Sequence, residues 1–357
     1  MRPLTASEAI SPALERTKLL LGNPFRSRTF LKIAAVAFFA DFGSSLNFNL
    51  PSNSSKFPAS SPGSIAAIAA VVAVVALIGL TIGLVLFYIG SRLQLVLVEM
   101  VATAQTMVAP VWRRTGIFTW RWIGMKLLFF LAAVLLVAVC ASPLIFYFVT
   151  HHDRFSSLSV SLIVTAVLIA LLLLLLVIVA YTLMRDFALP FLSLEGLSIS
   201  ATFERVNDIL AAEPGQVGLY LLLRLLLGFV IAIGMYVGVL ITLLISAIPF
   251  AAVGGGLWLA LHKAGTAGMA VLIVCAIAGG LAFLCWVVCL GIGAFGAMIT
   301  FFQAYALYFL GGRYPLLGDL LDRSAPPPAF PYIPGYPAYP PPPEPPSGAL
   351  PEAPPTL

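Results

Sequence analysis

The hydrophobic pattern of the chain consists of long apolar runs in which charged residues are nearly absent. Four such runs cover residues 64–90, 125–150, 158–184 and 218–247, and each holds at most one charged residue. A helix needs about 20 residues to cross the hydrocarbon core of a bilayer, and every one of these runs reaches that length. The pattern therefore predicts four transmembrane helices.

Two further stretches are less regular. The run from Gly268 to Leu310 is almost free of charge and too long for one ordinary crossing. It predicts one crossing over 268–294 and then a cytoplasmic helical extension along the interface, with two shorter spans as the alternative. Residues 29–50 hold Asp41 and a polar Gly-Ser-Ser step, so this segment crosses as a short helix or dips in and returns. Together the runs predict an all-α fold: a polytopic transmembrane helical bundle of about six spans within residues 29–311.

Composition agrees with this prediction. The 357 residues are 61% hydrophobic and 9% charged, whereas soluble domains have roughly 45–50% apolar and about 25% charged residues. A soluble globule of this length could not bury so much apolar surface, so the solvent of most of the chain is expected to be lipid. The basic residues form no stripe with interleaved aromatics, which argues against a nucleic-acid partner.

The positions of the basic residues predict an orientation. Of the nineteen Lys and Arg residues, Lys56, Arg154 and Lys263 alone fall in the predicted external loops 51–63, 151–157 and 248–267. Because Lys and Arg mark the cytoplasmic side, both termini are expected to be cytoplasmic. Without the first span the basic N-terminal residues would lie outside, which supports keeping that span. Arginine outnumbers lysine, which is typical of a GC-rich bacterial genome, so the expected location is a bacterial plasma (inner) membrane.

A pattern recurs on the predicted cytoplasmic side. Residues 13–16 precede Asn23-Pro24 and the first span, and residues 202–205 precede Glu213-Pro214 and the fifth span. A fainter copy runs from Gln94 to Pro110, ahead of the third span. Each copy predicts an amphipathic helix that stops at a proline and lies in the headgroup region, with residues 1–28 forming the first. The chain thus resembles three units, each an interfacial helix followed by a helical hairpin.

The C-terminal segment 312–357 has a different composition. From about Ser324 it is rich in proline, with three tyrosines, and such a segment cannot build a core. We expect a disordered cytoplasmic tail. Proline-rich strings dock into aromatic grooves in some complexes, but a solvated tail without a partner is the favoured interpretation.

Glycine pairs in the spans predict close helix packing. Gly79 with Gly83 and Gly234 with Gly238 have the spacing that lets two helices approach. The stretch 291–296 formally matches a dinucleotide-binding fingerprint. That motif requires a preceding strand and a helix N-terminus, whereas this stretch lies inside an apolar run, so helix packing is the better interpretation here too.

Few polar groups remain as candidates for a transport or polar site. Asp41 lies near the predicted outer end of the first span, and Arg224 lies six residues into the fifth, close enough to the cytoplasmic end to snorkel. The pairs Arg185-Asp186 and Glu204-Arg205 are expected to anchor helix ends or bridge interfacial helices.

Metal, cofactor and catalytic sites are not predicted. Cys285 and Cys289 lie one helical turn apart without a His or acid nearby, and the external pair His151-His152 lacks further ligands. No serine, cysteine or acidic pair has the partners that mark a hydrolase, and no carboxylate set suits a metal-dependent lipid transferase. These observations favour a protein that is not an enzyme.

Residues 10–18 with 23–26, and residues 201–214 with 219–224, carry a family resemblance. They resemble uncharacterised bacterial six-helix membrane proteins, which are similar to the membrane domain attached to some glycerophosphoryl diester phosphodiesterases. The resemblance implies a helical inner-membrane domain; the phosphodiesterase domain itself is absent, so hydrolysis is not implied. The leading hypothesis is a non-enzymatic scaffold or accessory protein that associates with membrane lipid and other membrane proteins. A transporter or channel for a small or apolar substrate and a membrane-embedded lipid enzyme are the alternatives.

Overall fold

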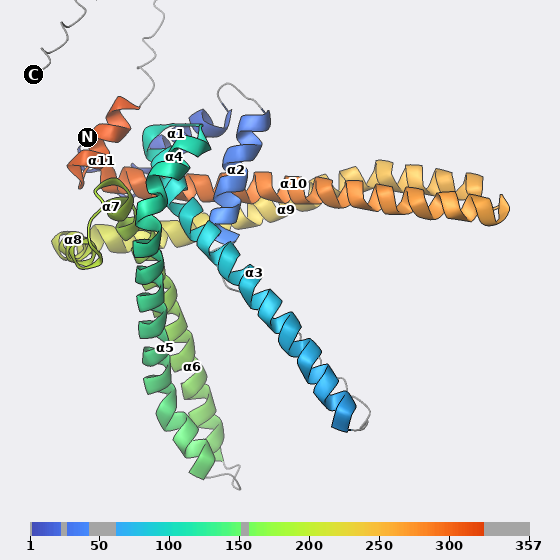
Figure 1. The fold of residues 1–357 in the computed structure, drawn as a ribbon. Helices are drawn as coiled ribbons and strands as arrows, with labels where there is room; N and C mark the ends of the chain where they lie inside the picture. The colour runs from blue at the N-terminus through green and yellow to red at the C-terminus, as the bar shows by residue number, and fades with distance from the viewer. Residues whose placement is uncertain (1, 23–26, 43–61, 151–156, 325–357) are drawn as a thin grey trace, which may run out of the picture. The chain divides into compact units, whose positions relative to one another are not determined.

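The computed structural model describes residues 2–22, 27–42, 62–150 and 157–324, and throughout these ranges the regular structure is helical (Figure 1). The helices, in chain order, are α1 (Ile10–Gly22), α2 (Ser27–Phe42), α3 (Pro62–Thr103), α4 (Val108–Thr115), η1 (Gly116–Phe118), α5 (Thr119–Thr150), α6 (Ser157–Leu183), η2 (Met184–Ala188), α7 (Leu189–Leu194), α8 (Ile199–Ala212), α9 (Pro214–Leu261), α10 (Gly265–Gly311) and α11 (Pro315–Arg323).

Five regions of the described chain are helical, long and apolar enough to cross a membrane, and they contain α3, α5, α6, α9 and α10. They correspond to the predicted spans 64–90, 125–150, 158–184, 218–247 and 268–294. The predicted first span is represented by α2, which has 16 residues and is shorter than a full crossing. Its remainder, from residue 43, lies outside the described residues, so a crossing by 29–50 stays a prediction.

Helix α10 is continuous over 47 residues, which corresponds to about 70 Å, more than twice the roughly 30 Å of a hydrocarbon core. The run to Leu310 is therefore one helix with an extension, as the sequence predicts, and not two short spans. Helix α3 is extended in the same way over 42 residues. No glycine or proline interrupts it between Ser91 and Thr103, so residues 94–103 continue α3. The predicted interfacial helix in this region is wrong in position, because the short helix before the third span is α4.

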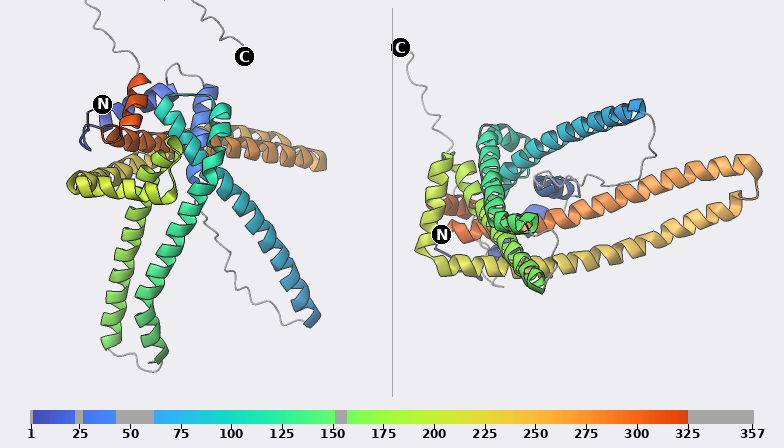
Figure 2. Two further views of the ribbon diagram at one scale, coloured as in Figure 1. Left: turned by 60° about the vertical axis from the view of Figure 1, so that its left-hand side comes forward. Right: turned by 90° about the horizontal axis from the view of Figure 1, so that it is seen from below.

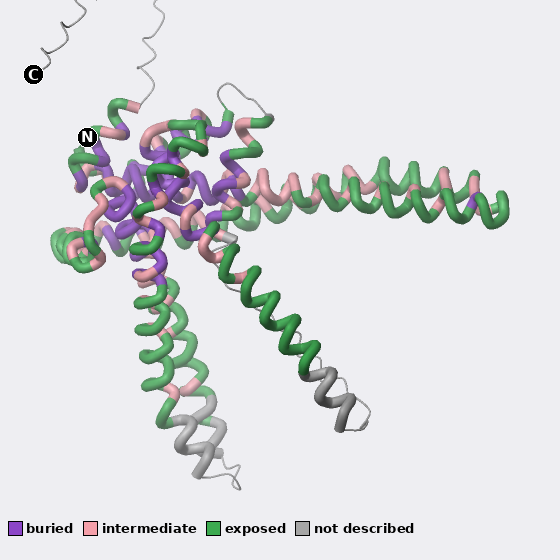
Figure 3. Tube along the Cα trace, in the orientation of Figure 1, coloured by how far each residue is buried: buried purple, intermediate pink, exposed green. Residues whose placement is uncertain are grey.

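Burial divides the helices into two regions (Figure 3). Buried residues concentrate in a region that we call the hub. The hub comprises α1, residues 91–103 of α3, α4, η2, α7, residues 296–311 of α10, and α11. Large side chains such as Trp122, Phe187, Tyr305 and Phe309 are buried there or at its edge.

We call the remaining lengths of α3, α5, α6, α9 and α10 the arms. Where the structure describes their side chains, the arms expose apolar groups over most of their surface. Helices α9 and α10 run side by side as a hairpin, and so do α5 and α6 (Figure 2). A helix that is apolar on all sides and unburied in its own chain is suited to a lipid environment.

Helices α1 and α8 precede α2–α3 and α9–α10 in the predicted order, whereas α4, which precedes α5 and α6, is not the copy that the sequence predicts. However, α1 does not lie free for an interface: Ala13, Arg16, Thr17, Leu20 and Leu21 are buried in the hub. Packing against α10 and α2 overrides the surface position that its amphipathic pattern alone predicts.

Helix α2 lies against α10 at glycines of the fingerprint-like stretch. The Phe30 ring would lie 3.3 Å from a Cβ added at Gly293, and the Ala34 backbone occupies the space where a Cβ of Gly296 would be. These glycines serve close helix packing, as the sequence predicts. In contrast, a Cβ at Gly79, Gly234 or Gly238 would meet nothing within 4 Å, so these faces have no partner within the described chain.

Candidate functional site

Charged side chains from several helices meet where the arms enter the hub. We call Asp41, Lys126, Arg185, Asp186 and Arg224 the root cluster. They come from α2, α5, η2 and α9, and therefore from all three of the units that the sequence suggests. Ionisable groups within apolar helices are costly to bury and mark candidate functional positions.

The π-helical turn η2 directs two neighbouring side chains to different partners. Pro190, at the start of α7, cannot donate a hydrogen bond to the carbonyl of Asp186, and its ring crowds that carbonyl. A widened turn relieves this conflict, and such turns often occur at functional sites. Arg185 pairs with Asp41 on α2, whereas Asp186 pairs with Arg224 on α9. The sequence placed Arg185 and Asp186 at a helix end, but it did not identify these partners.

Asp186 is the most deeply buried member of the cluster, with its side chain 1% exposed. Its carboxylate accepts a hydrogen bond from the Tyr220 hydroxyl at 2.8 Å and forms an ion pair with Arg224. Arg224 also donates to the Tyr220 hydroxyl at 3.0 Å. The three groups form a closed triangle, so both buried charges are paired and hydrogen-bonded, as burial requires.

Asp41 lies at the hub end of the arms, because its partner Arg185 lies two residues after the end of α6. The sequence pattern instead suggests the outer end of a first span. The two residues that the sequence singled out, Asp41 and Arg224, lie within electrostatic reach of each other. The structure thus joins two separate candidates into one cluster.

Lys126 was not singled out by the sequence analysis, although a lysine within the apolar run 125–150 is a visible signal. Its residue is 6% exposed, and its ammonium donates to the Ser91 hydroxyl at 3.1 Å. The ammonium also lies 5.4 and 5.1 Å from the ring centroids of Phe87 and Trp122, where it interacts with the π-systems. Asp41 and Arg185 lie within electrostatic reach.

A second buried cation, Arg16 of α1, holds two helix ends together. Its guanidinium donates to the carbonyls of Val101 and Ala102 at 2.9 and 2.8 Å, and to the Ser324 carbonyl and hydroxyl at 2.7 and 2.6 Å. These atoms belong to the C-terminal ends of α3 and α11, where unsatisfied carbonyls favour a cation. Burial lowers the pKa of Arg16, and the nearby Tyr308 opposes this shift.

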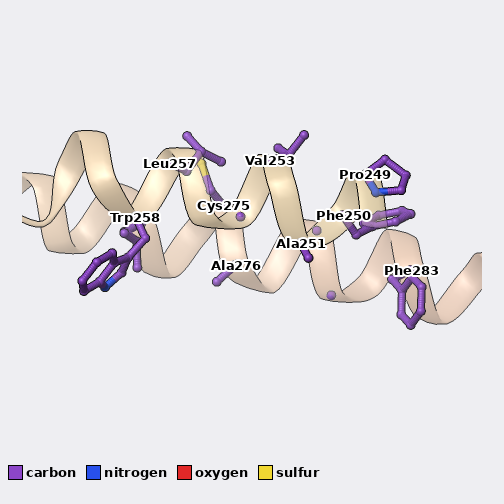
Figure 4. A pocket seen from close by; sticks show the side chains of 13 residues that line it. Pro249, Phe250, Ala251, Val253, Leu257, Trp258, Cys275, Ala276 and Phe283 are labelled. Carbon is purple, nitrogen blue, oxygen red and sulfur yellow. The ribbon is translucent and has the colours of Figure 1, made fainter. Parts of the chain in front are cut away.

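Two cavities lie away from the root cluster. A groove of about 650 Å³ runs between α9 and α10 and is lined by apolar residues, among them Pro249, Trp258, Cys275 and Phe283 (Figure 4). Pro249 lies inside α9, where it removes a backbone hydrogen bond and favours a bend. A second hollow, of about 590 Å³, lies between α5 and α8 beside Arg121.

Neither of the two cavities is lined by a member of the root cluster. Asp41 pairs with Arg185 and Asp186 pairs with Arg224, while Lys126 bonds Ser91. Neither cavity is lined by an acid or a histidine. The described residues contain no group of three metal-ligating side chains. His151, His152 and Asp153 lie outside the described residues, as does the tail after Ser324. What the cluster can do chemically is tie α2, η2 and α9 together through charge-assisted hydrogen bonds.

Comparison with known proteins places this architecture in a family. Searches of the curated proteins and of the solved structures found no match. A family model matches residues 4–320, which include the arms, every member of the root cluster and the hub except the last turn of α11. The chain therefore belongs to a family of unknown function, DUF7544.

Proposed function

We propose that this protein is a non-enzymatic membrane scaffold, with its hub on the cytoplasmic side of a bacterial plasma membrane and its arms in the bilayer. In this proposal the hub holds the arms in a fixed order, and the arms present apolar faces to lipid and to other membrane proteins.

The observation that carries the proposal is that the acids of the root cluster pair with arginines of other helices. Asp186 pairs with Arg224 and accepts a hydrogen bond from Tyr220, and Asp41 pairs with Arg185, so these charges join helices and line neither of the two cavities described above. A lipid enzyme would need two acids, or a histidine with an acid, facing a pocket. A scaffold needs only the joined helices, which is the arrangement observed.

The arms supply the surface for partners. Gly234 and Gly238 lie on one face of α9, and nothing in the described chain lies within 4 Å of a Cβ added at either position. Small residues at this spacing let the backbone of another transmembrane helix approach closely. We therefore place the contact with a partner membrane protein on this face.

Site-specific photocrosslinking in native membranes tests the proposal. A photoreactive residue at Val237, next to Gly238, is expected to give an adduct with a defined membrane protein. Gly234→Leu should abolish the adduct by blocking the close approach. Ala232→Leu, on the opposite side of α9, is the matched control and should leave it unchanged. Adducts with lipid alone, or equal loss in both variants, would contradict the scaffold role.

A transporter is the second candidate, and the burial of Lys126 and Asp186 at the ends of apolar helices is the observation that favours it. Flux across vesicles reconstituted with the protein separates the two functions. A transporter would show flux that Asp41→Asn alters, whereas a scaffold would show none above that of empty vesicles.

A further inference from the structure

Helix α4, the turn η1 and the start of α5 continue one another, because the backbone keeps right-handed helical angles where they join. One face of this continuous segment is buried, at spacings of three or four residues: Val111, Thr115, Thr119 and Trp122. The opposite face is exposed at the same spacings and holds Arg113, Ile117 and Trp120, which we call the exposed stripe. The exposed stripe combines a cation with two large apolar side chains, so it is a candidate interaction surface.

Two side chains of α3 fix the direction in which the exposed stripe faces. The Arg92 guanidinium donates to the Trp112 carbonyl at 2.7 Å and lies 4.2 Å from the centroid of the Trp112 ring. Glu99, which is buried, forms an ion pair with Arg114. Arg113, between these two anchored residues, is exposed and forms no ion pair within the described chain. Its charge is thus free to bind an anion outside the chain.

The chemistry of the segment changes along its axis in the order of a membrane leaflet. Arg113 comes first, followed by Ile117, which is 77% exposed, and Trp120, which is 69% exposed. From Leu127 onward, α5 exposes apolar side chains along the arm. The helix rises about 10 Å between Arg113 and Trp120, which is close to the roughly 5–8 Å thickness of a headgroup layer. With Trp120 at the border of the hydrocarbon, the long side chain of Arg113 therefore reaches the level of the phosphates.

A second helix marks the same level. The ring centroid of Tyr88 on α3 lies 5.7 Å from that of Trp120. Tyr88 lies where α3 changes its surroundings, because residues 70–86 are mostly exposed and residues 90–101 are mostly buried. Tyr and Trp are enriched at the border between membrane and water. Helices α3 and α5 thus enter the hub at one aromatic level, beside the exposed stripe.

The sequence around the exposed stripe carries charge of one sign. Residues 100–152 contain four Lys or Arg residues and no Asp or Glu. Anionic phospholipids give the cytoplasmic leaflet a negative surface potential, which attracts basic segments next to the membrane. A water-soluble partner would match the stripe but not the apolar surface of α5 that follows it, whereas a leaflet matches both.

We infer that the exposed stripe lies in the headgroup layer and binds anionic phospholipid of the cytoplasmic leaflet. Arg113 pairs with the lipid phosphate, and Ile117 and Trp120 pack against the upper acyl chains. The stripe thereby fixes the depth at which α5 enters the bilayer. The inference rests on the proposed membrane location, but it does not require a protein partner.

Native mass spectrometry of the purified full chain, titrated with phosphatidylglycerol or phosphatidylcholine, tests the charge preference. The unmodified protein should retain phosphatidylglycerol more strongly. Arg113→Gln should weaken that binding about fivefold, as expected for one arginine near an anionic surface, and Arg113→Glu should weaken it further. Arg323→Gln, which removes an exposed arginine at the end of α11 outside the stripe, is the matched control and should keep the preference.

Photocrosslinking in native membranes tests what touches the stripe. A photoreactive residue at Ile117 is expected to give an adduct with anionic phospholipid, and the exposure of Ile117 means that this replacement should leave the hub intact. Equal binding of the two lipids by the unmodified protein, or an equal loss in the Arg323 variant, would overturn the inference. A protein adduct at residue 117 with the Val237 adduct retained would overturn it and leave the scaffold role intact. A lipid adduct at residue 117 without a protein adduct at Val237 would support it and contradict the scaffold role.

Discussion

The two halves of α10 differ in their surroundings although both are apolar. Residues 265–295 are mostly exposed along the arm, whereas residues 296–311 are mostly buried in the hub. The buried half holds Thr300, Gln303 and Tyr305, while the exposed half holds almost no polar side chains. The Tyr305 hydroxyl donates to the carbonyl of Ala6 at 3.0 Å, so the polar groups of the hub connect segments that are distant in sequence.

This difference separates two sources of stability. The hub is stabilised by contacts within the chain, including buried ion pairs and stacked aromatic rings such as Tyr220 with Phe309. The arms have few contacts within the chain, so their stability depends on the lipid that surrounds them. The effect of a substitution in the arms should therefore depend on the lipid around the protein, whereas the effect of a substitution in the hub should not.

The largest expected effect is on the hub. Asp186→Ala leaves Arg224 buried without its carboxylate and should reduce the free energy of unfolding by about 3–5 kcal/mol. Thermal unfolding in detergent measures this loss. Asp208→Ala, at an exposed acid of α8, is the control and should change stability by less than about 0.5 kcal/mol. Similar losses in both variants would mean that the root cluster does not hold the hub together.

A charge in an arm should act on membrane insertion and not on the hub. Leu172 is 65% exposed in α6, and Leu172→Arg should disfavour insertion by about 3 kcal/mol. The fraction of α6 that crosses can be measured with a reporter fused beyond the helix, with Leu172→Ile as the conservative control. Unfolding of the hub in detergent should be unchanged. Normal insertion of the arginine variant would indicate that this arm does not face lipid.

Removing the cation between two helix ends should have a smaller effect. Arg16→Gln deletes charge-assisted hydrogen bonds to the ends of α3 and α11 and should cost about 2 kcal/mol. Lys18→Gln, which removes an exposed charge one residue past Thr17, serves as the comparison. Chemical denaturation of the two variants measures the difference. Equal denaturation midpoints for Arg16→Gln and Lys18→Gln would show that the carbonyls at the ends of α3 and α11 need no cation.

The smallest effect concerns pH. Burial raises the pKa of Tyr314 well above its usual range, and nearby Glu195 adds to the shift. Above about pH 10 the unfolded chain releases a proton that the folded protein keeps, so stability falls as pH rises. Tyr314→Phe should make this decline shallower in melting curves at increasing pH. A steeper decline in the Tyr314→Phe variant than in the unmodified protein would contradict this assignment.

The sequence predicted the long helices well because their signal is local. Residues 64–90 hold no charged residue, and 125–150 and 218–247 hold one each; apolar runs of this length form helices whatever they pack against. The glycines near 293 were also interpreted correctly, because a dinucleotide site requires a strand and the run has none. The position of the fainter repeat was wrong, since α3 continues through residues 94–103 where nothing stops a helix.

The root cluster could not be assembled from the sequence. Asp41 and Arg185 are separated by 144 positions, and adjacent Arg185 and Asp186 suggested local anchoring and not two different partners. Lys126 carried a signal, a charge within an apolar run, but its role depends on Ser91 and Trp122 in space. Burial of a charge is a tertiary property, because it depends on which distant helices arrive to pair with it.

By itself the sequence determined that the chain is helical and where its long apolar helices lie, because backbone groups in lipid must be satisfied within each helix. The tertiary structure alone decided which part of each helix enters the hub and which charges meet there. The physical reason is that hydropathy is a property of the segment, whereas the cost and compensation of a buried charge depend on the neighbours that the fold provides.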